Sequence, residues 1–179
     1  VCAQLQIRKK PDLSIIPASG TICAYDSILL SANNNYSFYS WYEDVGTNCI
    51  AGNYINSGNT IKVAPLTTTT YTLIADSLGC KDTACVTITV NPKPVITVSA
   101  TPSTICQGAS STLSYTSTVA ITSQQWYVSN AGCTSFTAIA GATGTTTVVT
   151  PNATTTYAVI GTTAGGCIEI GSATGRERA

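Results

Sequence analysis

Cysteine is the residue type in this sequence that offers the most chemistry. The chain has eight cysteines in 179 residues, and only 9% of its residues are charged. A structural zinc site needs four ligands, usually two close pairs of cysteine or histidine, whereas here Cys80 and Cys85 form the closest pair and histidine is absent. We therefore expect no metal site. So many cysteines without metal-binding spacing indicate disulfides, and hence an extracellular or cell-surface location.

Acid–base catalysis is not expected from the carboxylates. The eight acidic residues are scattered, and Glu43 and Asp44 are the only adjacent pair. Neighbouring residues of a strand point to opposite faces, so this pair is poorly placed to act on one substrate. Without histidine, the base that most enzymes use near neutral pH is also missing. We predict no catalytic residue, no cofactor and no enzymatic activity.

Charge and hydropathy argue against two classes of partner. Eight basic residues balance eight acidic ones, without the basic stripe that nucleic acids and anionic membranes require. No run approaches the roughly 18 consecutive apolar residues of a membrane-spanning helix. We therefore expect neither a nucleic-acid partner nor a membrane span.

The sequence contains two copies of one unit. Residues 11–23 (PDLSIIPASGTIC) align without a gap on residues 94–106 (PVITVSATPSTIC), at an offset of 83 residues, and four later matches follow in the same order at offsets of 84 to 87. Such an ordered series indicates tandem domains, at residues 11–93 and 94–179, joined by the proline-stiffened linker Asn91–Pro94. The later matches are Trp41-Tyr42 with Trp126-Tyr127, Cys49 with Cys133, Thr67–Tyr71 with Thr154–Tyr157, and Gly79-Cys80 with Gly166-Cys167.

Each copy is predicted to be an all-β domain. Apolar and polar residues alternate with period two, as in Val86, Ile88 and Val90, and β-branched residues dominate. A tryptophan in the third strand and a tyrosine at the start of the penultimate strand fit an immunoglobulin-like β-sandwich, in which both fill the core. In the first copy we expect strands near 12–17, 26–32, 37–43, 59–64, 69–76 and 84–91. The predicted core residues are Trp41, Trp126, Tyr71 and Tyr157.

Several short motifs recur in both copies or join them. They are Ile-Cys-x-x-x-Ser at 22–27 and 105–110, Trp-Tyr, Thr-Thr-Tyr, Gly-Cys, and Asn-Pro-x-Pro at 91–94. In this combination, which covers nearly the whole chain, the sequence resembles the tandem Ig-like or PKD-like repeats of large secreted surface proteins of Bacteroidetes. The resemblance implies a stalk or adhesion module of the gliding-adhesin type, often exported by type IX secretion, without catalysis of its own. The chain departs from that pattern in its extra cysteines, Cys49, Cys85 and Cys133.

Disulfide partners are predicted from the topology of such a sandwich. A turn between Cys80 and Cys85 would set them on opposed strands, at a distance that a disulfide spans. The loops before the second strand and after the third emerge at the same end of the sandwich, so we expect the cysteines in them to pair. The predicted pairs are Cys80–Cys85, Cys23–Cys49 and Cys106–Cys133. The alternative uses the two cysteines that these repeats commonly carry, as Cys23–Cys80 and Cys106–Cys167.

The preferred pairing leaves two cysteines over, Cys2 and Cys167. Cys2 lies nine residues before Pro11, which opens the first copy, and Cys85 lies nine residues before Pro94, which opens the second. Residues 1–10 are therefore predicted to be the last strand of a preceding copy or a donor strand. In the second copy the last strand is missing or atypical, because the alternation fails after Cys167. The chain is then either a fragment of a longer array or a fibre subunit. In the fibre, residues 1–7 would complete the second domain of the next molecule, with a Cys2–Cys167 disulfide across the junction.

Three triplets, each made of an Asp, then a Ser or Thr, then an apolar residue, resemble the short O-glycosylation signature of secreted Bacteroidetes proteins. The competing interpretation is that these Asp and hydroxyl side chains bond to their own backbone at turns. The candidate modified residues are Ser27, Ser77 and Thr83.

The leading functional hypothesis is an extracellular structural module, either a fibre subunit or an adhesin stalk. Its partners would be copies of itself or neighbouring repeats. The alternative is an adhesion module that binds a glycan or a surface protein through loops at one end of the sandwich.

Overall fold

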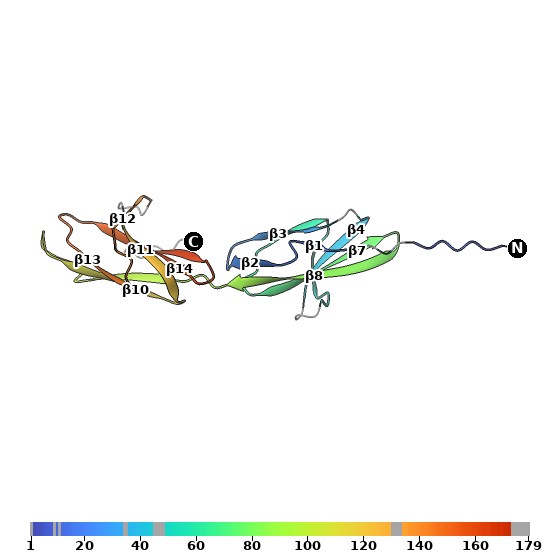
Figure 1. The fold of residues 1–179 in the computed structure, drawn as a ribbon, viewed down its shortest axis with the longest axis horizontal. Helices are drawn as coiled ribbons and strands as arrows, with labels where there is room; N and C mark the ends of the chain where they lie inside the picture. The colour runs from blue at the N-terminus through green and yellow to red at the C-terminus, as the bar shows by residue number, and fades with distance from the viewer. Residues whose placement is uncertain are drawn as a thin grey trace. The chain divides into compact units, whose positions relative to one another are not determined.

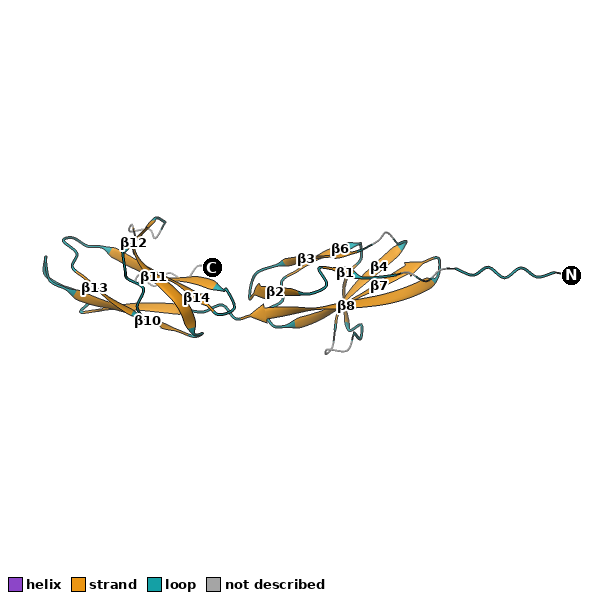
Figure 2. Cartoon of the chain, viewed as in Figure 1, coloured by secondary structure: helices purple, strands orange, loops and turns teal. Residues whose placement is uncertain are grey.

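The computed structural model describes residues 2–8, 10, 12–33, 36–44, 49–129 and 134–172. All regular elements among these residues are β-strands, β1 to β15. The chain divides into two compact units, Val1–Asn91 and Pro92–Ala179 (Figures 1 and 2). Each unit packs two sheets against each other, so the fold is all-β with two tandem Ig-like domains.

The first domain packs a three-stranded sheet against a five-stranded one. The small sheet has the order β1-β3-β6 and the large one the order β2-β8-β7-β4-β5. The strand β2 runs parallel to the end of β8, with Gly20 opposite Ile88, so the chain changes sheet between β1 and β2. The strands are β1 (Ile15–Ile16), β2 (Gly20–Cys23), β3 (Ile28–Ala32), β4 (Phe38–Glu43), β5 (Asn53–Asn56), β6 (Thr60–Val63), β7 (Thr69–Ser77) and β8 (Cys80–Asn91).

The second domain has the same two-sheet plan, but its larger sheet has four strands in the described residues instead of five. Its sheets have the orders β13-β10-β9 and β12-β11-β14-β15. In the described part of this domain no strand takes the place of β2, since residues 102–110 contain none. The strands are β9 (Ile96–Thr101), β10 (Ser111–Ser117), β11 (Ile121–Ser129), β12 (Phe136–Ala138), β13 (Thr146–Val149), β14 (Thr156–Thr163) and β15 (Ile168–Ser172).

A buried tryptophan lies in the core of each domain. Trp41 and Trp126 are both 0% exposed. Each indole Nε1 donates to a glycine carbonyl, from Trp41 to Gly58 at 2.9 Å and from Trp126 to Gly144 at 2.9 Å. Tyr71 and Tyr157 lie in the same two cores, at 4% and 9% exposure. Burial, together with the negative charge of Glu43, raises the pKa of Tyr71 to about 12.

The last hairpin of the first domain turns earlier than the sequence predicted. The strand β8 begins at Cys80, not at residue 84, and Ser77 lies opposite Cys80. Leu78 and Gly79 form the turn with φ angles of 55° and 87°, the positive values of a two-residue hairpin turn, which glycine adopts without strain. The Asp76 carboxylate accepts a hydrogen bond from the Gly79 N–H at 2.8 Å. Two further strands, β2 and β5, were not predicted. Every residue of β5 is exposed, so it lacks the alternation of buried and exposed residues that marks β6.

Candidate functional site

A disulfide fastens the segment before β5 to the outer face of the large sheet of the first domain. It joins Cys49 to Cys85, whose Cα atoms lie 5.6 Å apart. On β8, Val86 and Ile88 point into the core, so Cys85 points to the opposite face. Its neighbour across the sheet is Thr72 of β7. The bond therefore holds Cys49, which precedes β5, against the surface that faces away from the core.

The predicted pairs Cys80–Cys85 and Cys23–Cys49 are wrong. Because the turn lies before Cys80, both Cys80 and Cys85 belong to β8, five residues apart along one strand. At roughly 3.3 Å per residue their Cα atoms are far beyond disulfide range, and an odd separation puts their side chains on opposite faces. Cys23 lies beside Asn91 at the far end of β8, roughly 20 Å along the strand from Cys85.

The other predicted cysteine roles also change. Cys2 and Cys106 are exposed free thiols and Cys80 is a half-buried free thiol, so neither the Cys106–Cys133 pair nor the two alternative pairs form. Cys23 and Cys167 each take part in a disulfide. Cys167 is 0% exposed, and its N–H donates to the Thr163 hydroxyl at 3.2 Å. Because Cys167 already takes part in a disulfide, the predicted Cys2–Cys167 bond between molecules is contradicted. Cys133 lies outside the described residues.

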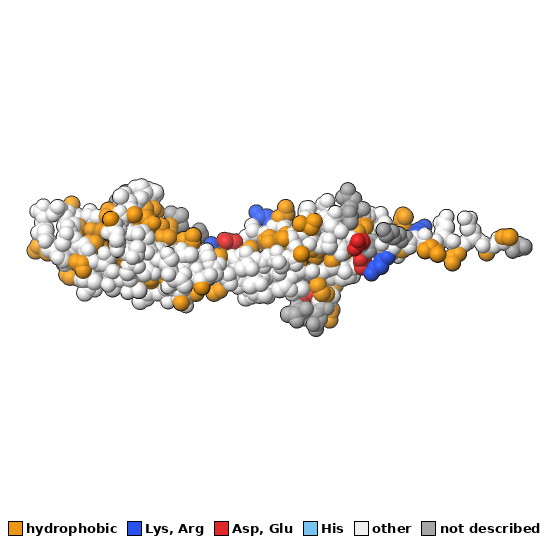
Figure 3. Space-filling view, viewed as in Figure 1, with side chains coloured by type: hydrophobic (Ala, Val, Ile, Leu, Met, Phe, Trp, Pro, Cys, Tyr) orange, Lys and Arg blue, Asp and Glu red, His pale blue; other side chains and the backbone are white. Residues whose placement is uncertain are grey.

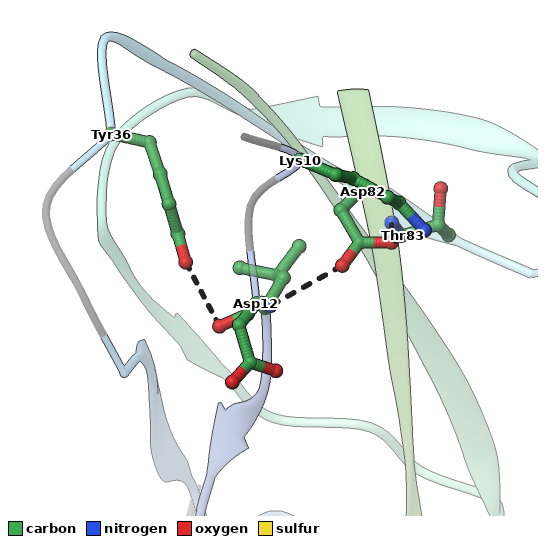
Figure 4. Close-up of polar contacts among 6 residues, drawn as sticks. Lys10, Asp12, Tyr36, Asp82 and Thr83 are labelled. Atoms are coloured by element: carbon green, nitrogen blue, oxygen red, sulfur yellow. Dashed lines mark hydrogen bonds and ion pairs between the residues drawn. The ribbon is translucent and has the colours of Figure 1, made fainter. Parts of the chain in front are cut away.

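A second feature, the N-terminal junction, consists of Arg8, Lys10, Asp12 and Leu13, which contact the first domain mainly at the β7–β8 hairpin (Figure 4). Lys10 Nζ lies 2.7 Å from Asp82 Oδ1, and the Leu13 N–H donates to Asp82 Oδ2 at 3.3 Å. The Tyr36 hydroxyl donates to the Asp12 carbonyl at 2.8 Å. The Arg8 guanidinium donates to the Leu78 carbonyl at the tip of the hairpin. One carboxylate thus holds both a lysine and the backbone of the segment that enters the first domain.

Sequence reasoning missed the N-terminal junction, although a signal was present. A lysine precedes the opening proline of both copies, as Lys10 and Lys93. An acid also follows the Gly-Cys motif of both copies, with Asp82 two residues after Cys80 and Glu169 two residues after Cys167. The repeated charges indicated a recurring role. Their proximity in the first domain follows from the fold, because Lys10 and Asp82 are 72 positions apart in the chain.

Acidification should loosen the N-terminal junction. The hydrogen bond from Lys10 holds the pKa of Asp82 below its usual range. A lowered pKa in the folded state means that the stabilisation is complete above the ordinary carboxyl pKa and is lost as the pH falls through the folded value. Asp82→Asn should lower the stability of the first domain at neutral pH by about 1 kcal/mol or less, because the lysine is largely exposed.

The measurement is urea denaturation of the first domain at pH 7 and at acid pH. Wild type should lose more stability on acidification than Asp82→Asn does, while Glu169→Gln in the second domain should leave this difference intact. An equal acid response in wild type and Asp82→Asn would contradict the assigned role of Asp82.

The segment before the junction is extended and exposed. Leu5 and Ile7 are 87% and 90% exposed, and Figure 3 shows hydrophobic side chains along this N-terminal segment. In the repeat register that aligns Cys2 with Cys85, Leu5 takes the place of Ile88, which is 0% exposed. The segment thus carries the core-facing residues of a last strand without a core of its own in the described chain.

The candidate glycosylation residues lie at the surface or partly buried. Ser27 and Thr83 are exposed and Ser77 is half-buried. Two of the three preceding acids bond to the local backbone, since Asp76 accepts from the Gly79 N–H and Asp82 accepts from the Thr83 N–H at 2.9 Å. This geometry fits the turn-stabilising interpretation, and O-glycosylation stays a prediction.

Aromatic side chains pair at the same place in both domains. Tyr42 of β4 meets Tyr54 of β5 edge-on, with ring centroids 5.7 Å apart, and Tyr127 of β11 meets Phe136 of β12 edge-on at 6.1 Å. Tyr54 is 59% exposed. These pairs lie on neighbouring strands at one side of each large sheet.

The described residues include no helix long and apolar enough to cross a membrane.

The comparisons with known proteins agree with a tandem organisation. A family model described as "Ig-like domain CHU_C associated" matches residues 11–92 and again residues 93–175. No curated protein matches the chain.

Similarity to solved structures is low. Three N-terminal domains of the bacteriophage RB49 Highly Immunogenic Outer Capsid protein align over 90% of this chain and 67% of their own, with 15% identity and a TM-score of 0.46. The fibronectin(III)-like modules of Clostridium thermocellum CbhA align over 93% and 98%, with 13% identity and a TM-score of 0.39. The N-terminal four Ig domains of Dscam1 isoform 6.9 align over 92% and 46%, with 13% identity and a TM-score of 0.34.

Proposed function

Because the chain belongs to the family of Ig-like domains described as CHU_C associated, we propose that it is an extracellular structural module, the stalk of an adhesin or a subunit of a surface fibre. Domains of this type are typically structural and not enzymatic. The observation that carries the proposal is the N-terminal segment, which has the pattern of a last strand and is exposed, whereas Arg8, Lys10 and Leu13 after it are bonded to the first domain. Such a segment connects this module to another one.

The connection is proposed to be a strand shared between modules. On β8 the core-facing residues are Val86 and Ile88, at 2% and 0% exposure. Aligning Cys80 with Cys167 puts Gly175 and Glu177 at the positions of Ile88 and Val90, so the second domain's own sequence has no apolar pair there. The N-terminal segment offers Leu5 and Ile7 in that register. A strand from another molecule would therefore complete the second domain better, by β-augmentation.

The observed disulfide also gives Cys2 a new expected partner. Cys2 occupies the position of Cys85 in the repeat, and Cys85 bonds to Cys49 of the same domain. We therefore expect Cys2 to bond to the Cys49-like cysteine of whichever module receives the strand. This applies both to a preceding module of one longer chain and to a module of another molecule.

Strand donation is tested by placing charges on one face of the N-terminal segment. Leu5→Asp with Ile7→Asp should abolish concentration-dependent assembly, because the buried face of the donated strand would carry two carboxylates. Gln4→Asp with Gln6→Asp puts the same charges on the other face and should assemble. Sedimentation velocity under oxidising conditions distinguishes the variants, and both should keep the first domain folded, since residues 8–13 are unchanged.

If the intact chain stays monomeric at high concentration, donation between molecules is wrong. The structural role within a longer array would then be tested separately, by non-reducing peptide mapping of Cys2 in material from the source. A Cys2 bonded within one chain to a preceding module supports the stalk.

A second function, ligand binding, is favoured by the repeated aromatic pairs. Tyr54 is exposed and lies beside Tyr42. A protein that binds a sugar through aromatic rings needs those rings to be exposed in this way. The edge-on geometry offers no flat platform for a sugar, which makes this the weaker candidate. Binding of the monomeric protein to a glycan array, lost in Tyr54→Ala, would support it.

A further inference from the structure

In the first domain, the short strand β2 covers the end of the last strand. It runs parallel to β8 and ends with Cys23 opposite Asn91. The Ala24 N–H continues this pairing, because it donates to the Asn91 carbonyl at 2.9 Å. A strand at the place of β2 therefore requires a last strand that reaches as far as Asn91. The pairing also fixes Cys23 at the end of the domain from which the chain leaves.

The second domain has the sequence of β2 without the strand. Residues 103–106 (STIC) stand 83 positions after residues 20–23 (GTIC), and they form no strand in the described segment 102–110. The partner of β2 is residues 88–91 of the last strand. In the N-terminal segment, residues 5–8 occupy the same positions of the repeat. A donated N-terminal segment would therefore supply the partner that residues 103–106 need to form a strand.

The register of this pairing predicts where Cys106 would lie after strand donation. Copying the pairing of β2 with β8 places Cys106 of the receiving molecule opposite Arg8 of the donor. The Arg8 guanidinium donates to the Leu78 carbonyl at the tip of the β7–β8 hairpin. Cys80 follows two residues later, as the first residue of β8. The register thus brings Cys106 of one molecule to the hairpin that carries Cys80 of the next.

The thiols at these two positions are free, whereas their counterparts in the repeat are oxidised. Cys106 is an exposed free thiol and Cys80 a half-buried one. Their counterparts in the other copy, Cys23 and Cys167, each take part in a disulfide. Both positions of the repeat therefore form disulfides when a partner is within reach. Cysteines left over in a disulfide-bonded extracellular protein indicate a bond to another molecule.

We propose that Cys106 of one molecule and Cys80 of the next form a disulfide that locks the donated strand. The inference rests on the proposed strand donation and names a covalent contact of that junction. Because the two cysteines belong to different domains, the contact is head-to-tail and repeats along a fibre without closing.

Forming this bond oxidises two thiols and therefore needs an oxidant, for which a small-molecule disulfide such as glutathione disulfide is sufficient. The thiolate of one cysteine attacks glutathione disulfide, which gives a mixed disulfide and releases one reduced glutathione. The thiolate of the other cysteine then attacks the protein sulfur of the mixed disulfide and releases the second glutathione. Each protein thiol loses its proton to the solvent or to a departing glutathione thiolate.

The test is non-reducing peptide mapping of isotopically light and heavy full-length chains, mixed and oxidised together in a glutathione redox buffer. A Cys80–Cys106 peptide pair with one light and one heavy half should appear, because the bond joins different molecules. A Cys80–Cys106 pair that is always of one isotope would show a bond within one chain and would overturn the proposal.

Variants separate the bond from the strand. In a Cys2→Ser background, Cys80 and Cys106 are the free thiols that remain among the described residues. Non-reducing electrophoresis of this variant should show a ladder of covalent oligomers. Adding either Cys80→Ser or Cys106→Ser should abolish the ladder, while sedimentation velocity should still detect assembly, since the donated strand is unchanged.

The outcomes distinguish this inference from strand donation itself. Assembly without a mixed-isotope Cys80–Cys106 peptide would overturn the disulfide and leave strand donation standing. Leu5→Asp with Ile7→Asp should lose both assembly and the mixed peptide. A mixed peptide that persists in that variant would also overturn the proposal, because the thiols would then oxidise without the junction. A wild-type chain that is monomeric by sedimentation and yields no mixed peptide would overturn both.

Discussion

Replacing Cys49 and Cys85 together by serine should lower the free energy of unfolding of the first domain by about 3 to 4 kcal/mol. The bond closes a loop between residues 36 positions apart, and the chain-entropy estimate for a loop of that size gives this magnitude. The stability of a small domain is itself only about 5 to 15 kcal/mol. The first domain should therefore become marginal, while the second domain is unchanged.

The measurement is equilibrium denaturation in the Trp126→Phe background, where Trp41 reports on the first domain alone. Cys80→Ser is the matched control, because Cys80 lies on the same strand as a free thiol. It should change stability by no more than about 1 kcal/mol. If Cys80→Ser costs as much as the double substitution, or if a Cys49–Cys85 peptide is missing from a non-reducing digest, the assigned pairing is wrong.

Trp41→Ala should destabilise the first domain by about 3 to 5 kcal/mol, the range of large-to-small core substitutions. The indole is fully buried, and its loss leaves a cavity and an unpaired Gly58 carbonyl. Trp41→Phe keeps most of the volume and should cost less. Trp126→Ala should have the same effect on the second domain, because Trp126 has the same burial and the same type of hydrogen bond.

Circular dichroism follows the unfolding of both domains, and the remaining tryptophan follows its own domain by fluorescence. In Trp41→Ala the Trp126 transition should stay at its wild-type position while part of the dichroism signal is lost at lower denaturant. A Trp126 transition that moves together with the rest would show that the two domains unfold as one unit, contrary to the division at residues 91 and 92.

The sequence was sufficient to predict the repeats, the strand class and the centre of each core. Tandem copies are visible as an ordered series of matches, and alternation with period two is a local property of the chain. Tryptophan and tyrosine are the largest side chains in a sequence poor in aromatics, so burial inside a small sandwich was the expected place for them. None of these inferences needed to know which distant residues meet.

The disulfide pairing and the N-terminal junction were decided by the tertiary structure. The turn was predicted at residues 81–84 but lies at Leu78-Gly79, so Cys80 and Cys85 are on one strand. Because successive residues of a strand point to opposite faces, this small shift changes which cysteines can meet. The glycine of the Gly-Cys motif, Gly79 in the first domain and Gly166 in the second, marked this turn. Lys10 meets Asp82, 72 positions away in the sequence, only because the fold places the segment before β1 beside the β7–β8 hairpin. Composition fixes which residues a chain can bury, whereas the contacts between charges and thiols depend on the register of strands that are far apart in sequence.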